Sequence, residues 1–420
     1  MLTTFSFERR SSESLSISRT RTSTAVNVFR GATVAETAKQ VAERRFGEHE
    51  PALRELSLWM YENPETAYEE FETSAKMADA LRAGGFEVEH PAYGLDTAFE
   101  ANIGSSGPRV VICAEMDALP DVGQACGHNI IATAGIGAGL ALGAVAYELG
   151  IRVTVLGTPA EEGGGGKVDL INAGAFKDAA ASMMIHPSGR DIVDPTFLAV
   201  HHLDVEFHGK DAHASSSPHV GVNALDAGVQ AYTAIAALRQ HILPTDRIHG
   251  IFVSGGSAAN IVPSYVKMTW YVRALTDERL AELSKKVNAC FEAAALSTGC
   301  TFNVSEIGCA YKDIRNDVAI AALYVENSAA LGRDMMWTAD APSHSFGSTD
   351  MGNVSYELPS IHPMLDLGAS PAVNHQPEFA AYTVTDEGMR MIRDGALAMA
   401  WTVVDLAEQD LWSKLGTYRV

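Results

Sequence analysis

Short, mostly apolar runs that alternate with helical stretches are the feature of this 420-residue chain that most limits its fold. Runs of this kind occupy residues 110–113, 153–156 and 181–185. A long Ala- and Gly-rich helix over 130–147 and a further helix near 168–173 separate them. Apolar strands joined by helices are typical of βαβ units, in which parallel strands are buried on both faces. The pattern therefore predicts an α/β fold with a mainly parallel sheet flanked by helices.

The pattern of the chain changes after about residue 198. Apolar and polar residues alternate strictly over 203–208 and again over 266–273, which is typical of strands with one buried and one wet face. Helices are expected over 224–238 and 277–295. Two-faced strands with helices on one side predict a smaller α+β domain in this part of the chain.

The smaller domain is expected to interrupt the first domain rather than to follow it. It spans 199–316, and the first domain comprises 41–198 and 317–420 because its Ala-rich helices and short strands return there. Residues 1–40 remain as an N-terminal arm. The start of this arm is rich in Arg, Ser and Thr, which also fits a targeting peptide. We predict the arm, which a neighbouring subunit would hold in place.

Composition limits the partners and the location of the protein. The net charge of −21 argues against nucleic-acid binding by a broad basic surface. The five cysteines form no close pairs, which favours a reducing, cytoplasmic setting over a disulfide framework. The uncharged run over 130–147 contains four glycines and lacks flanking basic anchors, so it predicts a buried helix rather than a membrane span.

Side chains that bind metals follow the predicted strands of the first domain. Cys126 and His128 lie between the first strand and the Ala-rich helix, Glu161 and Glu162 follow the second strand, and His186 follows the third. The carboxyl ends of parallel strands meet at one edge of a sheet, where ligands bind. Thiolate, imidazole and carboxylate together suit Zn, Mn, Co or Ni. The sequence therefore predicts one or two divalent metal ions at this edge.

The adjacent glutamates suggest a division of labour. One carboxylate would bind metal, while its neighbour would take a proton from a water that the metal activates. Taken singly, each of these residues also has an ordinary structural explanation: a buried cysteine, a core histidine or a solvated helix start. Their coincidence after three strands favours the metal site. The chain lacks the G-x-S-x-G elbow, the phosphate-binding loop and the H-E-x-x-H zinc helix.

Six segments of the chain resemble one known family. They are EMDALP at 115–120, ACGHN at 125–129, GTPAEE at 157–162, GKDAHA at 209–214, GSTDMGNVS at 347–355 and NHQPEF at 374–379. This set resembles the aminoacylase/carboxypeptidase-type dinuclear metallopeptidases. The most similar branch is that of the amidohydrolases, which includes p-aminobenzoyl-glutamate hydrolase and hippurate hydrolase. The resemblance runs in order from about residue 45 to 410.

The resemblance implies a dinuclear centre in a catalytic domain, and a lid domain over 199–316 that also dimerises. The implied metal ligands are Cys126, His128, Glu162, His186 and His375. Glu161 matches the general base and Asp117 a residue close to the metals. His213 matches a lid histidine that stabilises the oxyanion in a neighbouring subunit's site. Asn260 and Arg273 match lid residues that bind the substrate's carboxylate.

The chain departs from the family pattern at several positions. Classical branches carry His-x-Asp where this chain has Glu115-Met-Asp117, and Gln124 stands where similar sequences often carry histidine. Tyr311, His344 and the pair at 201–202 match no role in the family, and we treat them as structural. His344 is the one we single out, because it lies beside the segment at 347–355.

The expected function is that of a metal-dependent amidohydrolase, which cleaves the C–N amide bond of an N-acyl or N-aroyl amino acid or a dipeptide. An alternative is an aminohydrolase of the nitroanthranilate or aminobenzoate type, which releases ammonia from an aromatic amino acid, because an activated water attacks either kind of carbon once it is positioned. A third interpretation is a carrier that has lost activity, against which the complete set of site residues speaks. The expected partners are a small carboxylate-bearing substrate and a second copy of the chain, bound through the lid, or a larger homo-oligomer.

Overall fold

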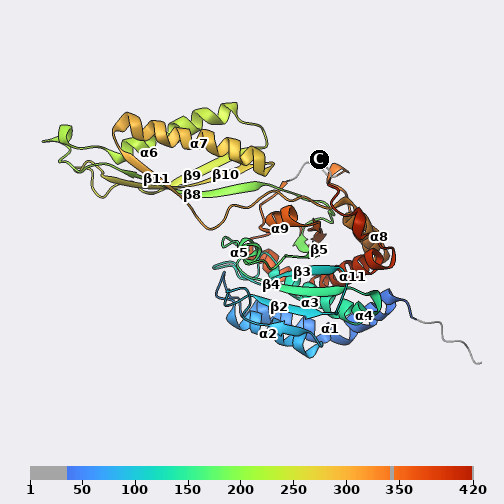
Figure 1. Cartoon of the computed structure of the whole chain (residues 1–420). Coiled ribbons are helices and arrows are strands. Elements are labelled where there is room, and N and C mark those ends of the chain that lie inside the picture. Colours follow the sequence, from blue (N-terminus) through green and yellow to red (C-terminus); the bar gives the residue numbers. More distant parts are fainter. Residues whose placement is uncertain (1–35, 341–344, 419–420) are drawn as a thin grey trace, which may run out of the picture. The chain divides into compact units, whose positions relative to one another are not determined.

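The computed structural model describes residues 36–340 and 345–418, and its central feature is a six-stranded sheet covered by helices (Figure 1). The predictions for the start of the N-terminal arm and for His344 lie outside the described residues. The strand order is β1 (Glu87–Glu89), β2 (Phe99–Ile103), β4 (Arg152–Thr158), β3 (Arg109–Glu115), β5 (Ala179–Met183) and β13 (Ser360–Ile361).

The six-stranded sheet is parallel at its centre and antiparallel at one edge. Strand β3 pairs in parallel with β4 and β5, and β13 pairs in parallel with β5. Strands β2 and β1 extend the sheet in antiparallel pairing. The α/β class and the mainly parallel sheet are confirmed. The third predicted strand is shorter than expected, because β5 ends at Met183 and His186 begins a separate strand, β6 (His186–Ser188), which pairs with β14 (Met364–Asp366).

The Ala- and Gly-rich run forms a buried helix, α3 (His128–Gly143). This helix packs against β3, α1 (Ala38–Glu62) and α11 (Asp386–Glu408), so almost all its side chains are buried. Gly139 explains the small residues, since a Cβ atom there would lie 2.2 Å from the side chain of Val155. A helix that is apolar all round belongs in a core. No helix within the described residues is both long and apolar enough to cross a membrane.

A second, four-stranded antiparallel sheet has its own core. Its order is β11 (Thr301–Glu306), β8 (Ala199–His208), β10 (Tyr265–Ala274) and β9 (Arg247–Ser254). Helices α6 (Ala224–Leu238) and α7 (Asp277–Thr298) cover one face of it (Figure 1). Val205, Trp270 and Phe291 are among the buried side chains of that interface. The alternation in the sequence is thus the alternation between this core and the face without helices.

The remaining elements connect or flank the two sheets. They are α2 (Phe71–Ala83), α4 (Ala146–Leu149), α5 (Gly166–Asn172), α8 (Val318–Ala330), α9 (Met351–Glu357), α10 (Pro377–Tyr382), β7 (Thr196–Phe197), β12 (Ser345–Phe346) and the 3₁₀ turns Pro218–Val220, Arg239–His241, Thr338–Asp340 and Trp412–Lys414. Helix α2 follows α1 after a break at 63–70, as the Asn63-Pro64 pair suggests.

Candidate metal centre

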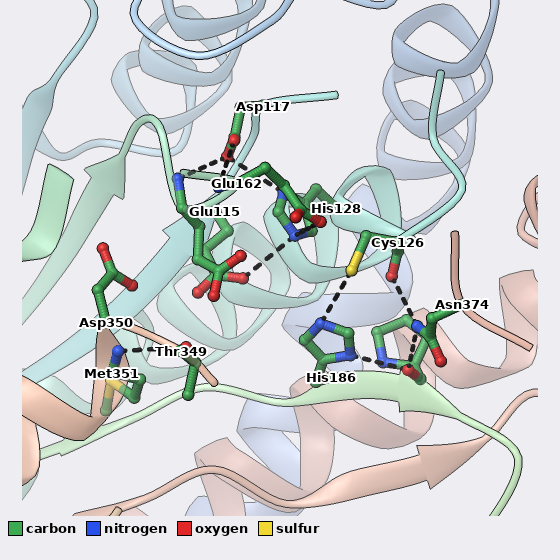
Figure 2. A network of polar contacts seen from close by, with 12 residues as sticks. Glu115, Asp117, Cys126, His128, Glu162, His186, Thr349, Asp350, Met351 and Asn374 are labelled. Atoms are coloured by element: carbon green, nitrogen blue, oxygen red, sulfur yellow. Dashed lines mark hydrogen bonds and ion pairs between the residues drawn. The ribbon is translucent and has the colours of Figure 1, made fainter. Parts of the chain in front are cut away.

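Five side chains from separate parts of the chain meet at the carboxyl edge of the parallel strands. They are Cys126, His128, Glu162, His186 and His375, the ligands that the family resemblance implies. Ligand atoms of Cys126, His128 and His186 lie within 4.8 Å of one another, and so do those of Cys126, Glu162 and His375. Figure 2 shows Cys126 and His186 turned toward each other, with His128 and Glu162 close by. We refer to these five residues as the ligand cluster.

The imidazole of His186 is oriented by the backbone. Its Nδ1–H donates to the carbonyl oxygen of Pro187 at 2.8 Å, which leaves Nε2 unprotonated and 3.4 Å from the Sγ atom of Cys126. A histidine that donates one ring N–H to a carbonyl and directs the other nitrogen into a cluster has the arrangement of a metal ligand.

Asp117 holds three members of the site in place. Its Oδ1 accepts from Nδ1 of His128 at 3.2 Å and from the backbone N–H of Glu161 at 3.1 Å. Its Oδ2 accepts from the backbone N–H of Glu162 at 2.9 Å. Asp117 is buried, so these bonds fix both the ring of His128 and the loop that bears the two glutamates.

His375 is held in a backbone conformation that is unusual for its residue type. Its φ angle is +70°, its backbone N–H donates to the carbonyl oxygen of Ala125 at 2.9 Å, and its Nε2 atom lies 3.4 Å from Oε1 of Glu162. The neighbouring Asn374 donates to the carbonyl oxygen of Pro187 at 3.1 Å. A strained residue that its surroundings hold in place is typical of functional sites.

Buried polar atoms without partners face one another inside the site. Oε2 of Glu115, Nε2 of His128 and Oε1 of Glu162 are buried and make no hydrogen bond. Nε2 of His128 lies 3.6 Å from Oε2 of Glu115 and 3.9 Å from Oε1 of Glu162. Such atoms destabilise a protein unless a ligand or an ion pairs with them. The donor set and these unpaired atoms therefore fit divalent metal ions.

The electrostatics of the site also favour a bound cation. Burial opposes a charge on His128, yet the carboxylates of Asp117 and Glu115 raise its pKa to about 10. Burial and the charges of Glu162 and Glu161 raise the pKa of the Cys126 thiol. Both directions indicate a strongly negative potential, which a divalent cation would neutralise.

Glu161 lies beside the ligand cluster and is buried. Its carboxylate oxygen is within 4.8 Å of ligand atoms of His128 and Glu162. Burial, together with the charges of Glu115 and Glu162, raises the pKa of Glu161. The hydroxyl of Tyr311, to which sequence reasoning gave no role, donates to the backbone carbonyl oxygen of Glu161 at 2.7 Å.

Lys167 is a component of the site that sequence reasoning missed. Its side chain is 0% exposed, and its Nζ atom lies 2.5 Å from Oε1 of Glu115 and 2.6 Å from Oδ1 of Asp350. Burial opposes its charge, but the carboxylates of Asp350 and Glu115 raise the pKa of Lys167. The lysine follows four glycines in the sequence, which is typical of an exposed loop, so no local signal marks it as buried.

The lid residues form a separate group. Arg273 on β10 donates to the hydroxyl of Ser348 at 2.7 Å. His213 and Asn260 are exposed and lie on neighbouring segments, since the N–H of Ala214 donates to the carbonyl oxygen of Asn260 at 2.9 Å. Neither residue belongs to the groups of metal-binding atoms found within 36–340 and 345–418. The described chain thus brings together the ligand cluster, Glu161 and Asp117, but not His213 or Asn260.

Comparison with known proteins gives relatives along most of the chain. It is 39% identical over 390 residues to the Xaa-Arg dipeptidase of Mus musculus, which covers 88% of this chain and 89% of the relative. It is 32% identical over 263 residues to one of the two chains of the p-aminobenzoyl-glutamate hydrolase of Escherichia coli, which covers 58% of this chain and 55% of the relative.

The fold and one family model point the same way. Residues 200–299 match the model of the peptidase dimerisation domain. The structure is similar to that of a dinuclear metal-binding peptidase from the M20 family of Bacillus subtilis, with a TM-score of 0.66 and 21% identity over 85% of this chain and 99% of the other. The chain therefore belongs to the M20 peptidase family, whose members are metal-dependent hydrolases that act on C–N bonds.

Proposed function

We propose that this protein is an amidohydrolase that cleaves the C–N amide bond of an N-acyl or N-aroyl amino acid or of a dipeptide. The observation that carries the proposal is the ligand cluster, in which sulfur, imidazole and carboxylate atoms converge next to the buried carboxylate of Glu161. The similarity to the mouse Xaa-Arg dipeptidase supports a substrate with a free carboxylate. In this account 41–198 and 317–420 form the catalytic domain, and 199–316 form the lid.

The ligand cluster would hold two divalent ions, and Cys126 would lie between them because it belongs to two of the overlapping groups of ligand atoms. We propose Zn, Mn, Co or Ni, since thiolate and imidazole ligands suit these metals. When bound, such ions lower the pKa of a water molecule and polarise a carbonyl group.

The chain's own residues would carry out the proton transfers. Glu161 takes a proton from the attacking water and delivers it to the amine nitrogen as the C–N bond breaks. Asp117 keeps Glu161 in position through the backbone N–H of that residue. The buried position of Glu161 excludes bulk water from the proton that it carries.

The lid would bind the substrate and complete the site. Arg273 and Asn260 would bind the carboxylate of the substrate, since a guanidinium group matches a carboxylate in shape and charge. His213, which is exposed in one chain, would stabilise the oxyanion in the site of the partner subunit. The five cysteines of the sequence are all free, which supports a reducing, cytoplasmic location.

Replacing Cys126 with serine is expected to reduce the metal content of the purified protein by about half or more, because serine is a much poorer ligand than a thiolate for these metals. The matched control is Cys113→Ala, since Cys113 is equally buried but contacts Ser182 instead of the ligand cluster. Elemental analysis measures both variants. Full metal content in Cys126→Ser would remove Cys126 from the ligand set.

The double variant Ile251→Glu/Val253→Glu is expected to convert a homodimer into a monomer. Both residues lie on β9, the edge strand of the second sheet, and they are 65% and 56% exposed. An apolar edge strand is a template for pairing with another chain, and charged residues block such pairing. Light scattering measures the mass. A wild-type monomer, or a double variant that stays dimeric, would contradict a dimer through β9.

A panel of substrates tests the proposed activity on the metal-loaded protein. N-acetyl and N-benzoyl amino acids and Xaa-Arg dipeptides are expected to yield a free amine, and aminobenzoates are expected to yield no ammonia. Ammonia release from aminobenzoates without amide cleavage would replace the proposal by an aminohydrolase activity.

A further inference from the structure

Four rings form a continuous row across the second sheet. His249 on β9, Tyr271 on β10 and His202 on β8 lie directly opposite one another on adjacent strands. The ring centroids of His249 and Tyr271 are 5.5 Å apart, those of Tyr271 and His202 are 4.0 Å apart, and those of His202 and Tyr311 are 6.2 Å apart. We refer to these four residues as the ring row.

The ring row lies on the face of the sheet that α6 and α7 leave uncovered. Strand β10 buries Trp270 and Val272 against the helices, so Tyr271 points to the opposite face. Cross-strand ring pairs do stabilise sheets. A row of four rings outside the core nevertheless exposes aromatic surface to whatever lies against that face, which is the more informative observation.

One end of the ring row reaches the proposed general base. The hydroxyl of Tyr311 donates to the backbone carbonyl oxygen of Glu161 at 2.7 Å. Arg273 lies two residues beyond Tyr271 on the same face of β10. A substrate whose carboxylate is at Arg273 and whose amide is at Glu161 therefore has the side chain of its carboxyl-terminal residue next to the rings.

We propose that the ring row is a stacking surface that selects substrates whose carboxyl-terminal residue has a planar side chain, either an aromatic ring or a guanidinium group. Aromatic rings and guanidinium groups both stack on tyrosine and histidine rings, whereas aliphatic chains and ammonium groups gain less from such a surface. This inference rests on the proposed function, because it assigns part of the substrate to the lid of the same site.

Two properties of His202 fit this role. Burial and the charge of Arg273 lower the pKa of His202 to about 4, so its ring is neutral near pH 7 and does not repel a guanidinium group. Its Nε2 atom is buried and has no hydrogen-bond partner, so it is free to bind a polar atom of the substrate.

The test compares Tyr271→Leu with Tyr265→Leu. Tyr265 lies on the same strand and the same face and stacks on His208, its cross-strand neighbour, but it belongs to the far end of β10 from Arg273. For dipeptides ending in Arg or Phe, Tyr271→Leu is expected to lower kcat/KM about fivefold to tenfold, and for those ending in Lys or Leu by less than about twofold. Tyr271→Phe should keep the selectivity, because it keeps the ring, and Tyr265→Leu should behave like the wild type.

A binding measurement separates this inference from the proposed activity. Calorimetric titration of the zinc-loaded protein with free L-arginine, L-phenylalanine, L-lysine and L-leucine should show a preference for Arg, Phe or both that Tyr271→Leu removes. Such a preference in a protein that cleaves no amide would leave the ring row standing and overturn the proposed activity. Amide cleavage with equal affinities for the four amino acids, a preference for Lys equal to that for Arg, or equal losses in Tyr271→Leu and Tyr265→Leu would overturn the ring row as a selective surface.

Discussion

Replacing Glu161 with glutamine is expected to lower kcat by about 10³-fold or more, within the range that a positioned general base contributes. Glutamine has nearly the same shape as glutamate but cannot take a proton from water. The backbone of residue 161 would stay in place, because its N–H donates to Asp117 and its carbonyl oxygen accepts from Tyr311. Steady-state kinetics on a cleaved N-acyl amino acid measures the loss.

The control for this variant is its metal content. Glu161→Gln should retain as much metal as the wild type, whereas Glu162→Gln should lose metal, because Oε1 of Glu162 faces the ligand cluster without a hydrogen-bond partner. Wild-type turnover in Glu161→Gln would show that another group takes the proton. Loss of metal in Glu161→Gln would instead make Glu161 a ligand.

Replacing Lys167 with methionine is expected to lower the free energy of unfolding by about 3–5 kcal/mol, the usual cost of removing one partner of a buried ion pair. The ammonium group of Lys167 contacts both Glu115 and Asp350, and all three side chains are fully buried. Methionine fills a similar volume but leaves two carboxylates without a counter-charge. Urea unfolding of the metal-free protein measures the change.

Two further variants show whether the loss has this cause. Lys39→Met removes an ion pair with Asp405 in which the lysine is partly exposed, so it should cost about 1 kcal/mol or less. Adding Glu115→Gln and Asp350→Asn to Lys167→Met should recover part of the stability, because the unpaired charges are then gone. A Lys167→Met variant that unfolds like Lys39→Met would contradict a buried, charged Lys167.

Periodicity in the sequence predicted those elements whose burial pattern is regular. The helix expected over 224–238 is α6 (Ala224–Leu238), and the helix expected over 277–295 is α7, which ends three residues later at Thr298. The alternating runs became β8 and β10. The antiparallel edge strands β1 and β2 were missed, because β1 has only three residues and none of them is buried.

Contacts between distant residues could not be predicted in this way. Sequence order alone placed Cys126, His128, Glu162 and His186 near one edge of the sheet, but His375 entered only through the family resemblance, since it lies far along the chain in a loop. The pairing of Lys167 with Asp350 joins residues 183 positions apart. Nothing in the local sequence of Lys167 distinguishes it from a solvated lysine, and only the fold brings its partners to it.

The ring row shows the same limit. The sequence shows His202 and Tyr311, but no pattern indicates that they belong together. Strand register brings His202 opposite Tyr271, and a bridge between Val200 and Tyr311 brings the fourth ring alongside. Pairing register is a property of the whole sheet, so residues without a local role in the sequence acquire one only in the folded chain.

Anomalous X-ray diffraction from crystals of the protein grown with zinc tests the central claim most directly, because it locates bound ions without relying on activity. The account predicts anomalous peaks at the ligand cluster, about 2.0–2.3 Å from Sγ of Cys126 and from ring nitrogens of His128, His186 and His375. Zinc bound elsewhere on the chain, with none at the ligand cluster of a protein that cleaves amides, would contradict it.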